Sequence, residues 1–302
     1  MTIDDGALVG NALRLLPSAN VGPGNTNILL LGDGYLRGQL GANGLFAQHC
    51  RELVAHITNE RWYRPELRLN IYSQEARSTD QGADIAAGCG VLPLTVKTYF
   101  DSIHGGGGLC RLLTGADATV ATVASAVADS VLGLNAEFDA VIVLVNSATY
   151  GASSYQLTAW VSAGYPGPEN FADMALHELG HVAALFDEYG YRSACNDKNK
   201  TWCGKPHIAA NVDKSPTSPQ WVAKVTPGFA LPTLSHPGRP ACLECYDPPD
   251  AVLGPFGSGV GTFEGSGWFH CGLYRPSAHC KMRNVEDPFC TVCVRELLRW
   301  LA

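Results

Sequence analysis

The chain of 302 residues lacks the features that mark most membrane proteins and nucleic-acid-binding proteins. No uninterrupted apolar stretch reaches the roughly 18 residues that a membrane-spanning helix needs. There is no run of Lys or Arg, and 21 basic against 28 acidic side chains give a net charge of -7, which disfavours nucleic acid and anionic membranes as partners. The N-terminus, Met1 to Asp5, is acidic and shows no signal peptide.

The sequence also lacks the motifs of nucleotide-binding proteins and of serine hydrolases. Gly32-Asp33-Gly34 begins like a dinucleotide-binding fingerprint, but Arg37 occupies the position of its last glycine. The glycines at 105–108 are not followed by the Lys-Ser/Thr pair of a phosphate-binding loop. No Gly-x-Ser-x-Gly sequence is present, which disfavours a serine hydrolase of that type.

The composition is that of a globular protein in which cysteine is unevenly distributed. Apolar residues make up 46% and charged residues 16% of a chain long enough for one large domain or for a domain with an elaborated second half. Eight of the eleven cysteines lie in the last 108 residues, in Gly- and Pro-rich sequence, which favours a loop-rich subdomain linked by disulfides. The alternative is a structural zinc site with four thiolates, Cys242 and Cys245 with Cys290 and Cys293. The odd total leaves at least one free thiol.

Hydrophobic periodicity predicts an α/β fold in the first part of the chain. The expected strands are 27–31, 67–72, 139–146 and 155–161, and the expected helices are 43–60, 93–103, 117–133 and 168–189. The unbroken aliphatic run at 139–146 is typical of a strand covered on both faces, and 155–161 is expected to be an edge strand. Strands separated by helices indicate a mixed sheet.

The second part of the chain contains few periodic segments. Residues 190–279 are rich in Gly, Pro, Ser, Asn and Cys and are expected to be irregular, and 295–301 is expected to close the chain as an amphipathic helix. We therefore divide the chain into an N-terminal α/β subdomain, residues 1–189, and a cysteine-rich subdomain, residues 190–302.

A short motif in the last helix of the first subdomain can bind a metal ion. His177 and His181 are four residues apart, so on a helix they lie on one face and can bind the same ion. Glu178 lies at the side of that face, where it can reach a metal-bound water without being a ligand, as a general base in metal-assisted hydrolysis requires. A motif with only three fixed residues also occurs by chance.

The acidic pair after this motif, Asp187 and Glu188, offers a third ligand. Asp187 stands ten residues after His177, the spacing at which metzincin peptidases place a third ligand after a turn has ended the helix. Because Ala184 replaces the glycine usual in that turn, the choice between the two acids stays open, with Asp187 favoured on spacing. Two imidazoles and a carboxylate would leave the fourth position of a catalytic zinc ion open to water. The alternative is that Asp187 only caps the helix end or forms a salt bridge there.

Five ordered blocks of the sequence resemble the IgA-peptidase family of zinc metallopeptidases. The blocks are Gly32-Asp33-Gly34-Tyr35, then His177-Glu178-Leu179-Gly180-His181 with Asp187-Glu188-Tyr189, then Phe263-Glu264-Gly265-Ser266-Gly267, then Tyr274-Arg275-Pro276-Ser277, and last Cys280-Lys281-Met282-Arg283 with Phe289-Cys290-Thr291-Val292-Cys293. The resemblance implies a metzincin-like mixed twisted sheet with an active-site helix, followed by the cysteine-rich subdomain. It implies one catalytic Zn²⁺ on His177, His181 and Asp187, with Glu178 as the base. Metzincins also have a methionine turn below the metal, which Met282 would supply, although a core-filling methionine is the alternative.

These features together predict a secreted or cell-surface zinc endopeptidase that hydrolyses proteins or peptides, with glycoproteins among its candidate substrates. The missing signal peptide argues against export of this form of the chain. One alternative is a non-catalytic zinc-containing module for recognition of or adhesion to glycoproteins, and another is a zinc amidase acting on a non-peptide amide. A substrate peptide is expected to add to the edge strand at 155–161. The candidate donors to the oxyanion are Tyr189, Tyr274, His279 and Arg283.

Overall fold

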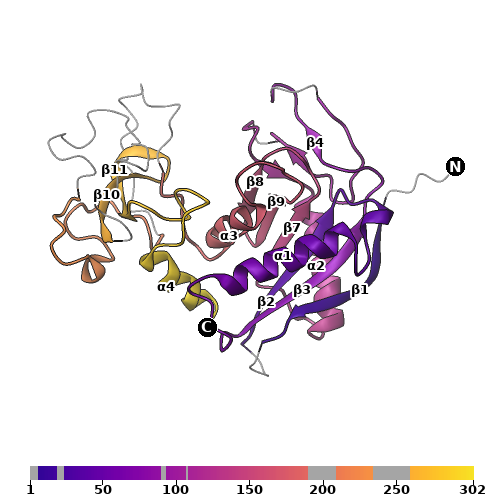
Figure 1. The fold of residues 1–302 in the computed structure, drawn as a ribbon, viewed down its shortest axis with the longest axis horizontal. Helices are drawn as coiled ribbons and strands as arrows, with labels where there is room; N and C mark the ends of the chain where they lie inside the picture. The colour runs from indigo at the N-terminus through magenta and orange to yellow at the C-terminus, as the bar shows by residue number, and fades with distance from the viewer. Residues whose placement is uncertain (1–5, 19–23, 90–92, 107, 190–208, 234–258) are drawn as a thin grey trace. The chain divides into compact units, whose positions relative to one another are not determined.

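The structure, a computed structural model, describes residues 6–18, 24–89, 93–106, 108–189, 209–233 and 259–302 (Figure 1). Its contacts divide the chain into two compact units, residues 1–182 with 300–302, and residues 183–299, and each unit is described by itself. Among the described residues, no helix is both long enough and apolar enough to cross a bilayer.

The first unit is built on a six-stranded mixed sheet in the order β1-β3-β2-β7-β9-β8. The strands are β1 (Ala7–Leu16), β2 (Thr26–Asp33), β3 (Leu69–Arg77), β7 (Ala140–Val145), β8 (Ala152–Tyr155) and β9 (Thr158–Ser162). The four inner strands are parallel, and the outer strands β1 and β8 are each antiparallel to their neighbour. The prediction of an α/β fold on a mixed sheet is confirmed.

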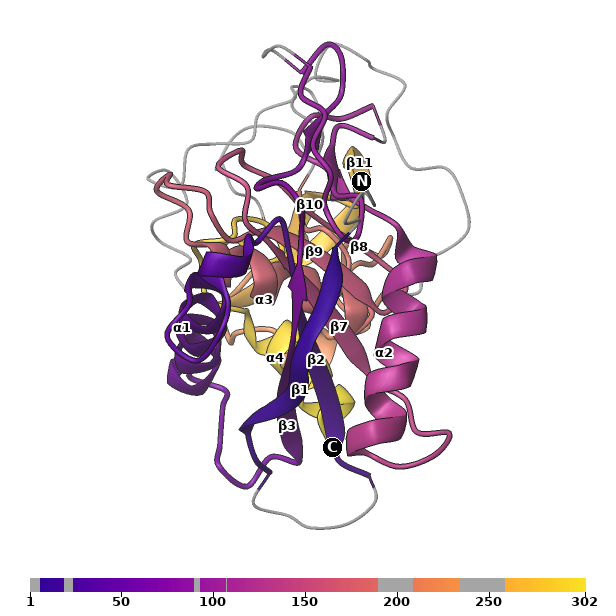
Figure 2. The same cartoon turned by 90° about the vertical axis from the view of Figure 1, so that its right-hand side faces the viewer.

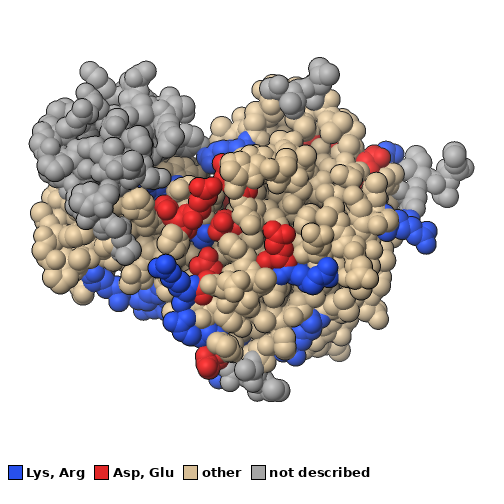
Figure 3. Space-filling model, in the orientation of Figure 1, with Lys and Arg blue, Asp and Glu red and all other residues tan. Residues whose placement is uncertain are grey.

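Helices α1 (Leu45–Asn59) and α2 (Asp117–Val131) cover opposite faces of this sheet, as Figure 2 shows. Successive strand residues point to opposite faces, and Leu29 and Leu31 of β2 pack in one core cluster with the valines of α2. Gly32 faces the other side, where a Cβ atom would come within 2.8 Å of the Phe46 ring of α1. Most of the surface visible in Figure 3 is uncharged, and its charged side chains are of both signs.

Burial on both faces explains why the inner strands were visible in the sequence. Every residue of β7 is buried, so the strand reads as an unbroken apolar run. The strands predicted at 27–31, 67–72 and 139–146 and the helices predicted at 43–60 and 117–133 are confirmed.

The helix predicted at 93–103 is wrong. In that segment Leu94 forms an isolated bridge with Ile85, and Ile103 begins a short strand. The carboxylate of Asp84 accepts the N–H of Val96 at 2.6 Å, and such a side-chain bond offers the backbone an alternative to a helix. The segment contributes to a three-stranded sheet of β4 (Asp84–Ile85), β5 (Ile103–His104) and β6 (Leu113–Thr114).

The edge strand is β8 rather than the segment 155–161 that was predicted. That segment crosses a hairpin turn, because Tyr155 ends β8 and pairs with Thr158 at the start of β9. Gln156, in the turn, has a φ of +52°. The strand that follows lies inside the sheet, and its Trp160 is 1% exposed. The alternation that indicated one strand therefore came from the end of one strand and the start of the next.

The second unit contains a β-hairpin and most of a C-terminal helix. Its elements are β10 (Val260–Ser266), β11 (Phe269–Ser277), a 3-10 turn at Val222–Lys224 and α4 (Thr291–Trp300). The prediction that 190–279 is irregular is wrong for this hairpin, whereas 190–208 and 234–258 lie outside the described residues. The helix predicted at 295–301 is confirmed and begins at Thr291. The subdomain boundary placed after residue 189 stays a prediction.

Candidate metal centre

The helix that carries the histidine motif, α3 (Phe171–Val182), is buried against the sheet. It begins after Asn170, whose Oδ1 accepts the N–H of Ala172 at 2.8 Å and so caps the helix. It packs against β8 and β9. In its first turn, Asp173 accepts a hydrogen bond at 2.9 Å from Nε2 of His56 on α1. These contacts fix the position and the rotation of α3 in the first unit.

The two histidines of the motif lie one turn apart on α3. The ring centroids of His177 and His181 are 4.9 Å apart and their planes are at 88°. Glu178 is 6% exposed and His177 is 7% exposed. A carboxylate buried beside two imidazoles is expensive to desolvate unless it acts on a cation or on a group that a cation binds.

The chain turns at the position where the sequence lacks the expected glycine. Helix α3 ends at Val182, so the prediction that it continues to residue 189 is wrong, and Ala184 has a φ of +62°, in the left-handed region. An L-residue in this region costs about 1 kcal/mol relative to glycine. The turn is therefore made by alanine at some cost in stability, and the replacement does not prevent it.

Beyond this turn, Asp187 brings a carboxylate to the two histidines. The ligand atoms of His177, His181 and Asp187, which belong to one continuous stretch of chain, all lie within 4.8 Å of one another. Asp187 is 4% exposed. Two imidazoles and one carboxylate at this spacing fit the donor set of a catalytic zinc ion.

The turn of the β10–β11 hairpin holds Asp187 by three hydrogen bonds. Nε1 of Trp268 donates to Oδ2 of Asp187 at 2.6 Å. The N–H of Gly267 and the hydroxyl of Ser266 donate to the carbonyl of Asp187 at 2.9 and 3.1 Å. Sequence reasoning missed Trp268, although it directly follows a glycine-rich block of the family resemblance.

Glu188, the other candidate for the third ligand, belongs to a different group of side chains. It is fully buried, and its Oε1 accepts a hydrogen bond from Nδ2 of Asn211 at 3.0 Å and lies 3.1 Å from Sγ of Cys293. Burial raises the pKa of the Glu188 carboxyl well above its usual range. Asn211 also bonds to the backbone N–H and C=O of Phe186 at 2.9 and 2.7 Å, which fixes the segment just before Asp187.

The cysteines near Glu188 differ from their prediction. Cys280, Cys290 and Cys293 are free thiols, so the predicted disulfide pairing is wrong for these three. Cys195, Cys203, Cys242, Cys245 and the side chain of Cys271 lie outside the described residues, which leaves the four-thiolate alternative a prediction. The disulfide that the structure describes joins Cys89 to Cys110, and the expectation of a free thiol is also met by Cys50.

The predicted oxyanion donors and the methionine turn lie in the second unit. Among the oxyanion candidates, Tyr274 contacts Glu264 at 3.5 Å and His279 contacts Asp287 at 3.6 Å. Arg283 donates to the carbonyl of Ala278 at 3.3 Å, and the carbonyl of Tyr189 accepts the N–H of Trp268 at 2.9 Å. In the predicted methionine turn, the carbonyl of Met282 accepts the N–H of Glu188 at 2.8 Å.

Sequence reasoning missed a further candidate, Tyr150. The pKa of its phenol is raised by burial and, to a smaller extent, by the carboxylates of Glu169 and Glu178, so the phenol lies within electrostatic reach of the motif.

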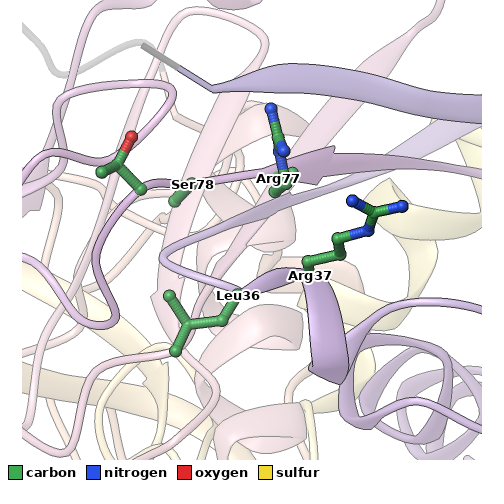
Figure 4. Close-up of a pocket in the computed structure, with 5 residues that line it drawn as sticks. Leu36, Arg37, Arg77 and Ser78 are labelled. Atoms are coloured by element: carbon green, nitrogen blue, oxygen red, sulfur yellow. The ribbon is translucent and has the colours of Figure 1, made fainter. Parts of the chain in front are cut away.

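A pocket of about 300 Å³ opens elsewhere in the first unit, after the ends of β2 and β3. It is lined by Leu36, Arg37, Arg77, Ser78 and Thr79. Figure 4 shows the two arginine side chains on the same side of this pocket. None of the motif residues lines it, so it is not part of the candidate metal centre.

Comparison with known proteins agrees with the family resemblance. The model of the family described as IgA Peptidase M64 matches residues 18–237, which include the inner strands of the sheet, α3 and the acidic pair after it. The cysteines from 280 to 293 lie beyond the matched residues. No curated protein matches the chain.

Proposed function

The chain belongs to the IgA peptidase M64 family of metallopeptidases, and on that premise we propose that it is a zinc-dependent endopeptidase acting on protein substrates. The observation that carries the proposal is the grouping of His177, His181 and Asp187 within 4.8 Å around one position. Their donor set is that of catalytic zinc, with a fourth position left for water. The left-handed turn at Ala184 between the helix and Asp187 supports a metzincin-like arrangement.

Glu178 is the residue that we assign as general base. A zinc ion held by the three ligands would lower the pKa of a water molecule and polarise the scissile carbonyl. Glu178 is next to His177 on α3 and is almost completely buried, so its carboxylate is held in a low-dielectric environment beside the ligands. It accepts the proton of the attacking water and returns it to the leaving amine. Tyr150 joins the earlier candidates as a donor to the oxyanion.

Strand β8 is the place at which we propose that the substrate binds. It is the outer strand on the side of the sheet against which α3 packs, so a peptide added along it would lie close to the motif. The N–H of Ala152 is already bonded to the carbonyl of Arg111 at 3.1 Å. Strand addition is therefore confined to the other end of β8, around Ser154 and the exposed Tyr155.

The disulfide between Cys89 and Cys110 supports a location outside the cytoplasm. We assign the protein to the cell surface or the extracellular space on this ground and on its family. Glycoproteins stay among the candidate substrates because the family name refers to one.

The test compares Glu178→Gln with Glu169→Gln. Both changes remove a carboxylate near Tyr150, but only Glu178 stands beside a ligand. The zinc content of both variants should equal that of the native chain. Turnover of a mixed library of protein substrates should fall by about 10²- to 10⁴-fold in Glu178→Gln and stay near the native rate in Glu169→Gln.

Two results would count against the proposal. Full activity of Glu178→Gln would remove the base from the mechanism. If the native, zinc-loaded chain cleaved nothing in the library, and the chelator control did not differ from it, the recognition module would be favoured over the peptidase.

A further inference from the structure

Three free thiols and one carboxylate converge in the interior of the second unit. Cys280, Cys290, Cys293 and Glu188, which we name the thiol cluster, are all buried, and one ligand atom of each lies within 4.8 Å of the others. None of the four is a ligand in the catalytic centre proposed above. We propose that the thiol cluster binds a second metal ion, a structural Zn²⁺ with three thiolate ligands and one carboxylate ligand.

The distances in the cluster fit a shared ion better than a disulfide. Sγ of Cys280 lies 3.6 Å from Sγ of Cys293. A disulfide bond is about 2.05 Å long. Two sulfurs bound at about 2.3 Å to one tetrahedral zinc ion are separated by about 3.8 Å. The spacing is therefore already close to that of two zinc ligands.

The content of the cluster also favours an ion. A disulfide between two of the thiols would leave the third thiol and Glu188 in the dry interior. Oε2 of Glu188 is buried and makes no hydrogen bond with any described residue. Buried polar atoms without a partner are rare in folded proteins. One four-coordinate ion would use all three sulfurs and this carboxylate.

Local structure prepares the ligands for a metal. Cys290 directly precedes α4 and Cys293 lies in its first turn, where the helix dipole favours thiolates. The N–H of Cys290 donates to Sγ of Cys280 at 3.4 Å, and Nδ2 of Asn211 donates to Oε1 of Glu188 at 3.0 Å. Hydrogen bonds of this kind orient metal ligands. Because protein ligands fill all four positions, the site is closed, as structural zinc sites are.

An ion in the thiol cluster would join two segments that carry parts of the proposed active site to the start of α4. Glu188 follows Asp187, Cys280 lies two residues before Met282, and the other two thiols begin α4. The N–H of Glu188 already donates to the carbonyl of Met282 at 2.8 Å. The second ion would therefore hold Asp187 and the predicted methionine turn in a fixed relation without taking part in catalysis.

The first test is the zinc content of the purified full-length chain by mass spectrometry of the metal. The native chain should hold two zinc ions, and a His177→Ala/His181→Ala variant should keep one. A histidine variant without zinc would overturn the inference about the thiol cluster. A histidine variant that keeps both ions would instead overturn the proposed catalytic centre, so the two failures are distinguishable.

The second test identifies the ligands by loading the histidine variant with Co²⁺, which gives an intense thiolate-to-metal absorption in the near ultraviolet. Adding Cys280→Ser should weaken this band, and adding Glu188→Gln should shift the visible bands of the ion. Cys50→Ser, which changes a buried free thiol outside the cluster, should alter neither.

Two outcomes of these experiments refute the thiol cluster as the second metal site. Loss of the band in Cys242→Ser/Cys245→Ser would indicate the four-thiolate site. A disulfide between Cys280 and Cys293 found by peptide mapping without reductant would show that the cluster is oxidised and does not hold a metal.

Discussion

The hydrogen bond from Trp268 to Asp187 gives a direct test of how the proposed third ligand, Asp187, is held. In Trp268→Phe the aromatic ring stays but the indole N–H, which lies 2.6 Å from Oδ2 of Asp187, is lost. Residue 268 has a φ of +69°, and Phe meets the same backbone strain there as Trp does. The substitution therefore changes the hydrogen bond with little change in the turn.

The size of the effect follows from the type of bond. A hydrogen bond to a charged acceptor contributes about 1.5–3 kcal/mol, and a tenfold change in affinity corresponds to about 1.4 kcal/mol. Trp268 is 43% exposed, so solvent weakens the bond and the lower end of the range applies. We expect zinc to bind about 10-fold more weakly at the site of His177, His181 and Asp187 in Trp268→Phe. Competition with a chromophoric chelator measures this affinity.

Trp221→Phe is the matched control. It also removes an indole N–H, which donates to the carbonyl of Gly261 at 2.7 Å, but this acceptor is not a candidate ligand. Trp221 is 1% exposed, so its loss should lower the free energy of unfolding by about 1–3 kcal/mol and leave zinc affinity unchanged. The role of Trp268 in positioning Asp187 would be refuted if Trp268→Phe bound zinc as tightly as the native chain. It would also be refuted if Trp268→Phe and Trp221→Phe lost the same amount of zinc affinity.

The remaining predictions concern pH and the turn after α3. Burial lowers the pKa of His104 to about 4, below the value of about 6.5 in an unfolded chain, so stability should be complete above about pH 6.5 and fall by about 3 kcal/mol as the pH drops towards 4. In His104→Gln, which can still bond to the Ser147 hydroxyl, urea unfolding should lose this acid dependence; an unchanged pH profile would contradict it. Ala184→Gly should raise the free energy of unfolding by about 0.5–1 kcal/mol, whereas Ala184→Val should lower it by at least about 1 kcal/mol, since a β-branched residue is strained at this φ. Thermal unfolding measures both, and a stabilising valine would contradict the assigned turn.

The parts of the fold that could be predicted are those where a single requirement, such as burial on both faces or the spacing of metal ligands, determines the sequence pattern. The inner strands are buried on both faces, so their apolar runs have few other interpretations. The helix of the metal motif could be placed because its histidines require helical spacing.

The hairpin of the second unit could not be predicted because its glycines, which are typical of loops, lie in its two strands and in the turn between them. Gly265, Gly267 and Gly272 have φ values of +95°, +59° and +82°, and they allow irregular pairing within β10 and β11 and the turn that joins them. In sequence the same residues indicate a loop. Strand β1 was missed for a related reason, since it is an outer strand with no buried residue and with two register shifts.

The block Gly32-Asp33-Gly34-Tyr35 shows that a motif shared with a family need not be catalytic. Asp33 is completely buried, and burial raises the pKa of its carboxyl despite hydrogen bonds from Ser102, Ser78 and the N–H of Phe100. Gly34 has a φ of +70°, and a Cβ atom there would lie 2.3 Å from the carbonyl of Gly82. The block therefore connects β2 to the loops beside it.

The acidic pair after α3 illustrates what sequence spacing can and cannot decide. Spacing favoured Asp187 over Glu188 but treated them as competitors for one ion. The two carboxylates belong to different groups of side chains, so they are not equivalent choices for one metal. The carboxylate of Asp187 groups with two histidines, and that of Glu188 groups with three thiols. If both groups bind zinc, the pair is a link between a catalytic ion and a structural ion, and substituting Glu188 would disturb the catalytic site through the backbone of Asp187.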